Sequence, residues 1–200
     1  MSTPTFVRII CEGKTTEPRY FQGILKAYGW RGARVHKPKD HSPTGIVREA
    51  KREYNRALKA KIPRSNIHVW AVLDRDDHAN LKNALQDAYD NSIRVAFSSV
   101  CFEYFIVLHF EKCTRPFESC DAVIKYLREK YQQDYGKGAD HYDNLKDSFQ
   151  TAIDNNHWLL TQHLQYEEIN GNSVADRNPY TDVYRLLKFL TGLKDPDEQN

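Results

Sequence analysis

Three carboxylates follow an apolar stretch near the middle of the chain. The stretch Ile67–Leu73 is rich in β-branched and aromatic residues, which predicts a buried strand, and Asp74, Asp76 and Asp77 come directly after it. In an extended chain, Asp74 and Asp76 point to the same side. Like charges placed so close resist ionising together, and a bound cation with a preference for hard oxygen ligands would stabilise them. The alternative is that these aspartates cap a helix that begins near Ala79.

A fourth carboxylate, Glu12, follows a second predicted strand, Phe6–Cys11. In an open parallel sheet, functional residues gather beyond the carboxyl ends of the strands, and consecutive strands are often neighbours. We therefore expect Glu12 to lie near Asp74 and Asp76. Three acidic ligands suit a Mg²⁺ site that binds a substrate phosphate and activates water. Lys14 and the N-terminus of the following helix would offer positive potential to that phosphate.

Predicted strands alternate with predicted helices over the first half of the chain. Strands are expected at Phe6–Cys11, Ala33–Lys37, Ile67–Leu73 and Ile93–Phe97, and helices between Thr15 and Gly29, over Thr44–Lys61, over Ala79–Asp90 and over Cys101–Phe110. This alternation favours an α/β fold, with a small, mostly parallel sheet that has helices on both faces. From Thr114 onward the sequence predicts helices only, at Phe117–Tyr131, Asp140–His157 and Pro179–Leu193. We expect an α/β core in residues 1–112 and a helical C-terminal portion in residues 113–200, packed on the core.

The composition indicates a globular chain that forms one domain, with room for a modest appendage. Its 200 residues are 40% hydrophobic and 12% aromatic. No stretch approaches the ~20 apolar residues that cross a bilayer, and the N-terminus lacks the features of a secretory signal. The four cysteines, Cys11, Cys101, Cys113 and Cys120, include no C-x-x-C pair. We therefore predict reduced cysteines and a cytoplasmic location.

The charges are distributed unevenly along the chain. Residues 1–64 carry 15 Lys and Arg against 5 Asp and Glu, whereas residues 65–200 carry 14 against 22. A basic segment of this kind indicates a polyanionic partner such as nucleic acid, unless the two halves neutralise each other in space. The predicted helix over 44–61 presents a basic row made of Arg48, Lys51, Arg52 and Arg56. This row is either a phosphate-binding surface or a solvated helix face.

Four blocks of residues, spread over nearly the whole chain, form a pattern found in a known family. The blocks are Cys11-Glu12-Gly13-Lys14-Thr15-Thr16-Glu17-Pro18-Arg19-Tyr20-Phe21, Asp74-Arg75-Asp76, Cys101-Phe102-Glu103 followed by Leu108-His109-Phe110, and Asn178-Pro179-Tyr180-Thr181-Asp182-Val183. Together they resemble the RloB family, a branch of the Toprim-like proteins. That family usually has Asn-Pro before Cys-Phe-Glu, where this chain has Ser99-Val100.

The resemblance implies a Mg²⁺-dependent Toprim nuclease of the kind found in prokaryotic restriction and abortive-infection (antiviral defence) loci, often beside an AAA or ABC-type ATPase. On this basis Glu12 is a metal ligand or general acid/base, and Asp74 and Asp76 are the metal-binding pair. Glu103 is a further ligand or base, unless it reaches the surface from the first turn of its helix. Lys137, in a glycine-containing loop, would stabilise the charge on a phosphorane, unless it is simply solvated.

Two other classes of function compete with the nuclease. A Toprim-derived scaffold could bind nucleic acid or an ATPase partner without cutting. A phosphotransferase is disfavoured because the sequence has no G-x-x-x-x-G-K-[ST] loop. His78 and His109 are weak candidates, since a histidine within an apolar helix is usually hydrogen-bonded core. The sequence leaves open the choice between DNA and RNA, the choice between Mg²⁺ and Mn²⁺, and the oligomeric state.

Overall fold

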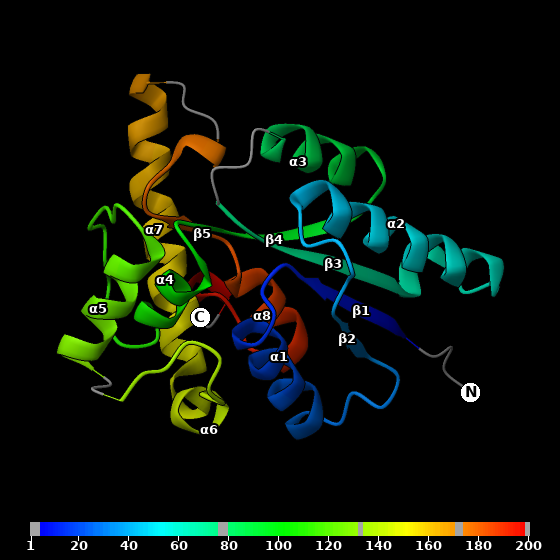
Figure 1. Ribbon diagram of the computed structural model, residues 1–200, viewed down its shortest axis with the longest axis horizontal. Helices are drawn as coiled ribbons and strands as arrows, with labels where there is room; N and C mark the ends of the chain where they lie inside the picture. The colour runs from blue at the N-terminus through cyan, green and yellow to red at the C-terminus, as the bar shows by residue number, and fades with distance from the viewer. Residues whose placement is uncertain (1–4, 76–79, 132–133, 171–173, 199–200) are drawn as a thin grey trace. The chain divides into compact units, whose positions relative to one another are not determined.

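The computed structural model describes residues 5–75, 80–131, 134–170 and 174–198, which form an α/β fold (Figure 1). The elements are β1 (Phe6–Cys11), α1 (Thr16–Ala27), β2 (Arg34–His36), α2 (Pro43–Lys59), β3 (Ile67–Asp74), α3 (Leu81–Asp90), β4 (Arg94–Ser99), α4 (Phe102–Val107), α5 (Cys120–Lys130), α6 (Tyr142–Leu145), α7 (Phe149–Asn170), β5 (Tyr180–Thr181) and α8 (Tyr184–Thr191). The predicted fold class, with a mostly parallel sheet and helices at the C-terminal end, is confirmed. Within the described ranges, no helix combines the length and the apolar character needed to cross a membrane.

Contacts within the chain separate it into two compact units. The first contains residues 1–73 and 77–96, and the second contains residues 74–76 and 97–200. The five strands have the order β2-β1-β3-β4-β5 in one sheet.

In the first unit, β1 is paired in parallel with β2 on one side and with β3 on the other. Ile9 pairs with Val35 of β2 and with Trp70 of β3. From β1 to β2 the chain crosses to the strand on one side of β1, and from β2 to β3 it crosses back in the opposite direction, past β1. Since crossovers between parallel strands are right-handed, α1 and α2 must cover opposite faces of the sheet. Figure 1 shows this arrangement, with α3 on the same side as α2.

A buried ion pair connects β1 to α2. Arg8 Nε donates to Glu53 Oε2 at 3.0 Å, and the two side chains are only 10% and 8% exposed. Arg8 Nη1 also donates to the backbone carbonyls of Val7 and Gly32, at 2.8 and 2.9 Å. Burial lowers the pKa of Arg8, and the contact with Glu53 opposes that shift. The guanidinium therefore lies inside the unit with its donors directed at oxygen atoms.

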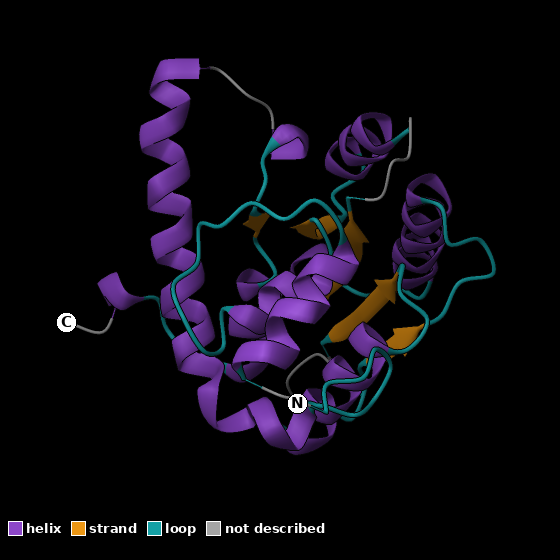
Figure 2. Cartoon of the chain, turned by 60° about the vertical axis from the view of Figure 1, so that its left-hand side comes forward, coloured by secondary structure: helices purple, strands orange, loops and turns teal. Residues whose placement is uncertain are grey.

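The second unit is mainly helical, and the long helix α7 packs against α4, α8 and β5 (Figure 2). Its interior contains His109, whose side chain is 2% exposed and whose Nδ1 is hydrogen-bonded to the carbonyl of Phe105 at 3.1 Å. Burial lowers the pKa of His109 to about 4, so the ring is neutral at pH 7. The interpretation of His109 as a core histidine is confirmed.

The C-terminal part of the chain differs from its prediction as helices only. The helix predicted over Pro179–Leu193 begins later than expected, since α8 begins at Tyr184. Tyr180–Thr181 instead forms β5, which is antiparallel to β4. Ser98 Oγ and Thr181 Oγ1 are hydrogen-bonded at 3.0 Å across the two strands. A strand of two residues is too short to show periodicity, so only pairing with β4 reveals it.

Two other helix boundaries in this region also differ. The single helix predicted over Asp140–His157 begins at Tyr142 as the short helix α6, and after a 3-10 helix over Lys146–Ser148 it continues as α7, which ends at Asn170. Helix α5 begins at Cys120 instead of Phe117, because the Ser119 side chain accepts a hydrogen bond from the Ala122 N–H at 3.3 Å and caps the helix there.

Asp182, which follows β5, should make the stability of the protein depend on pH. Its carboxylate is 8% exposed, and Oδ1 accepts a hydrogen bond from the Phe97 N–H at 2.7 Å. Burial raises the pKa of this carboxyl from 3.8 to about 6. The folded state then binds the proton more tightly than the unfolded state, and this difference stabilises the folded protein. The contribution to the free energy of unfolding is complete below about pH 4 and is lost as the pH rises through about 6.

Asp182→Asn keeps the acceptor oxygen and cannot ionise. Between about pH 4 and pH 7, we expect the free energy of unfolding of the variant to rise relative to wild type by roughly 1–3 kcal/mol. Urea denaturation of both proteins across this pH range measures the difference. If the difference stayed constant, the Asp182 carboxyl would not titrate in this window.

Candidate functional site

The carboxyl ends of β1 and β3 lie at the same edge of the sheet. These strands are parallel neighbours, with Cys11 paired with Val72, and the Glu12 N–H donates to the Val72 carbonyl at 3.1 Å. Glu12 directly follows β1 and is 8% exposed. Asp74 is the last residue of β3 and is half-buried.

Asp74 does not cap the next helix. Helix α3 begins at Leu81, and Asn80 occupies its N-cap position. Within the second unit, the Arg75 N–H donates to the Ser98 carbonyl at 2.8 Å. The alternative of a helix cap is thus wrong for Asp74. Asp76, Asp77 and His78 lie outside the described residues, so their predicted roles remain predictions.

A buried acid that the sequence analysis did not select lies beside Gly13. Glu17, in the first turn of α1, is 4% exposed, and a Cβ atom on Gly13 would lie 1.9 Å from its Oε2. A side chain on Gly13 would therefore have to displace the Glu17 carboxylate from its buried position. Because an acidic residue at a helix N-terminus is common, no sequence pattern marked Glu17 as part of a site. The structure makes it a further candidate.

The predicted basic row is ion-paired with neighbouring acids. The pairs are Arg48 with Asp40 at 2.7 Å, Lys51 with Asp87 at 2.8 Å, Arg52 with Glu49 at 2.8 Å and Arg56 with Glu53 at 3.5 Å. Hydrogen bonds from Ser42, and then from Arg48, lower the pKa of Asp40 to about 2, so its charge is present at neutral pH. These pairs favour the alternative of a solvated helix face, although most of them are exposed and would exchange readily for phosphate contacts.

A shallow hollow of about 400 Å³ adjoins the N-terminal half of this row. The hollow is lined by Lys37, Pro38, Lys39, Asp40, Gly45, Arg48, Glu49 and Arg52. Four of these residues are basic and two are acidic, so the lining retains net positive charge. Lys14 is exposed and lies outside this lining. The binding of nucleic acid by Lys14, Arg48, Lys51, Arg52 and Arg56 remains a prediction.

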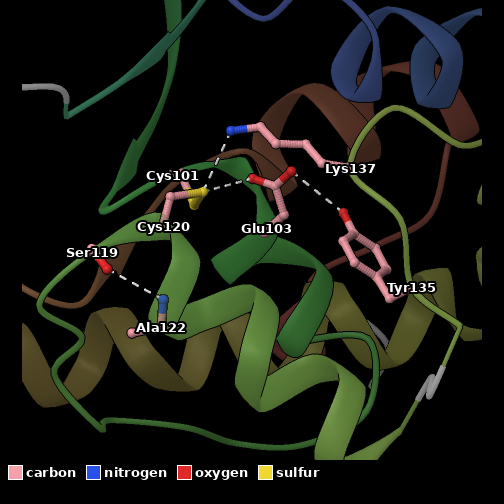
Figure 3. Close-up of a disulfide and its surroundings, with 7 residues drawn as sticks. All are labelled: Cys101, Glu103, Ser119, Cys120, Ala122, Tyr135 and Lys137. Atoms are coloured by element: carbon pink, nitrogen blue, oxygen red, sulfur yellow. Dashed lines mark hydrogen bonds between the residues drawn. A yellow bond between two sulfur atoms is a disulfide. The ribbon is translucent and has the colours of Figure 1, made fainter.

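Two other predicted residues, Glu103 and Lys137, meet around a disulfide in the second unit (Figure 3). Cys101 and Cys120 are bonded to each other, with their Cα atoms 5.6 Å apart. Glu103 Oε2 lies 3.3 Å from Cys120 Sγ, and Glu103 Oε1 accepts a hydrogen bond from the Tyr135 hydroxyl at 3.4 Å. Lys137 Nζ lies 3.7 Å from Cys120 Sγ. We call these five residues the cysteine cluster.

The cysteine cluster corrects two expectations. The prediction of reduced cysteines was wrong for Cys101 and Cys120, whereas Cys11 and Cys113 are buried and form no disulfide. The two bonded cysteines are 19 residues apart and become neighbours only through the packing of α4 against α5. Glu103 is 1% exposed, so the alternative in which it reaches the surface is also wrong.

The mostly parallel sheet with helices on both faces defines an α/β protein, and its candidate residues follow the carboxyl ends of the strands. The chain matches the family described as RloB-like protein over residues 7–190. It therefore belongs to the RloB-like family, which confirms the resemblance. No curated protein and no solved structure matches the chain.

Proposed function

We propose that this protein is a Toprim-type nuclease that cleaves nucleic-acid phosphodiesters with Mg²⁺ or Mn²⁺. The observation that carries the proposal is the register of β1 and β3, in which Cys11 pairs with Val72. Because the two strands are parallel neighbours, Glu12 directly follows β1 at the edge of the sheet toward which β3 also runs. In open α/β sheets, ligands bind at this edge.

The donor set at this edge fits a hard divalent cation. Glu12 and Asp74 supply carboxylate oxygens, which Mg²⁺ and Mn²⁺ prefer, and Asp76 would add a third. When bound, the cation would stabilise negative charge on the phosphate and lower the pKa of a water molecule that it binds. Glu12 would act as ligand or as general acid/base for the attacking water and the leaving oxygen.

The family membership also supports a place for this activity in prokaryotic anti-phage defence. We propose a cytoplasmic protein that acts on DNA or RNA and works with an AAA or ABC-type ATPase. The hollow beside the basic row would contact the phosphate backbone, since nucleic-acid affinity comes largely from such contacts. The competing function is a binding module that recognises the same partners without cleavage.

The test combines metal binding with cleavage. We expect isothermal titration to detect Mg²⁺ and Mn²⁺ binding by the folded protein, and labelled DNA and RNA panels to show cleavage, with or without the neighbouring ATPase. Glu12→Gln keeps the shape of the side chain and removes its charge, so it should lose cleavage while its melting temperature in EDTA stays near that of wild type. If the folded wild type binds neither metal, the binding module is the better description.

A further inference from the structure

The cysteine cluster brings three potential metal ligands, two sulfur atoms and one carboxylate, together inside the second unit. The sulfur atoms of Cys101 and Cys120 and a carboxylate oxygen of Glu103 all lie within 4.8 Å of one another. Cys101 and Glu103 are 2% and 1% exposed, whereas Cys120, at the start of α5, is partly exposed. The three donors are thus held by packed helices, with an approach from the side of Cys120.

The contact between Glu103 and Cys120 is better suited to the reduced state than to the disulfide. A disulfide sulfur carries no hydrogen, so in the oxidised pair the 3.3 Å contact with Glu103 Oε2 joins two acceptors. After reduction, the Cys120 thiol can donate to that oxygen, or both atoms can bind one cation. Tyr135 donates to the other oxygen of Glu103 and fixes the orientation of the carboxylate.

The charges of the cluster match a divalent cation. Two thiolates and one carboxylate carry three negative charges, and Lys137, at 3.7 Å from Cys120 Sγ, supplies one positive charge. A bound divalent cation would bring the sum to zero. Thiolates favour soft or borderline ions such as Zn²⁺ over Mg²⁺, and three protein ligands leave a fourth tetrahedral position for water.

We propose that Cys101, Glu103 and Cys120, once reduced, form a binding site for Zn²⁺ or a similar thiophilic divalent cation. The site forms only when the disulfide is cleaved. A phosphine reductant gives two electrons to the S–S bond and takes the oxygen atom of water to become a phosphine oxide. The two protons of that water go to the two sulfur atoms, and the cation displaces them on binding. The ligands of this site differ from Glu12 and Asp74, and the proposal does not depend on nuclease activity.

Cobalt provides a direct readout, because Co²⁺ substitutes for Zn²⁺ and gives thiolate-to-metal charge-transfer bands. We expect the phosphine-reduced, anaerobic protein to bind one Co²⁺ with such bands in the presence of excess Mg²⁺, and Zn²⁺ to displace it. Untreated, disulfide-bonded protein should show no such bands. Cys101→Ser, Cys120→Ser and Glu103→Gln should each weaken binding at least ~10-fold, since each removes a ligand.

Cys113→Ser is the matched control, because Cys113 is a buried free cysteine outside the cluster. It should bind Co²⁺ like wild type. The proposal is overturned if the folded, reduced wild type shows no charge-transfer bands, or if Glu103→Gln binds as tightly as wild type. The comparison of oxidised and reduced wild type needs no variant, so it holds even if a cysteine variant fails to fold.

Discussion

Asp74→Ala is expected to lower the rate of nucleic-acid cleavage at least ~10³-fold, because it removes a predicted metal ligand. Asp74 ends β3, which pairs in parallel with β1, the strand that precedes Glu12. In the absence of metal, like-charged carboxylates oppose one another, so removal of one should leave the fold intact or slightly stabilise it. Mg²⁺ should therefore raise the melting temperature of wild type but not that of the variant.

The measurement pairs single-turnover cleavage with melting temperatures in EDTA and in Mg²⁺. Asp90→Ala serves as the control, since Asp90 is an exposed acid at the end of α3, and it should retain both cleavage and the Mg²⁺ effect. If Asp74→Ala melts well below wild type in EDTA, Asp74 has a structural role and the proposed metal site is wrong.

Glu53→Gln should produce the largest loss of stability, about 3–5 kcal/mol in the free energy of unfolding. The Arg8 guanidinium is 10% exposed and lies 3.0 Å from Glu53, so the substitution leaves a buried charge without its counter-ion. Glutamine preserves the volume of the side chain, which separates the electrostatic effect from a loss of packing. Urea denaturation at neutral pH measures the change.

The control for this prediction is the same substitution one turn earlier on α2. Glu49 pairs with Arg52, whose side chain is 75% exposed, so Glu49→Gln should cost no more than about 0.5 kcal/mol. The double variant Arg8→Met/Glu53→Met should recover much of the stability, since an apolar pair does not require charge compensation. Equal losses for Glu53→Gln and Glu49→Gln would show that the buried pair contributes little.

Local patterns were enough to predict most of the first unit. The strand predicted at Phe6–Cys11 has those bounds in the structure, and the one predicted at Ile67–Leu73 ends one residue later, at Asp74. Runs of apolar and β-branched residues identify buried strands, because a strand covered on both faces excludes polar side chains over its whole length. The prediction that carboxylates follow these strands rested on the same pattern.

The sequence failed where the structure depends on contacts between distant residues. The disulfide joins cysteines 19 residues apart, β5 exists through its pairing with β4, and Glu17 is buried against Gly13 by the turn between β1 and α1. Each of these features involves few residues, so none leaves a periodic signal in the sequence.

By itself, the sequence determined the fold class, the family and the identity of the acidic residues at the strand ends, because these follow from local hydrophobic patterns and short motifs. Only the tertiary structure decided that β1 and β3 are neighbours, that Glu53 neutralises Arg8, and that Glu103 faces a pair of cysteines. These arrangements depend on strand order and helix packing, in which burial of apolar surface brings together side chains that no local pattern connects.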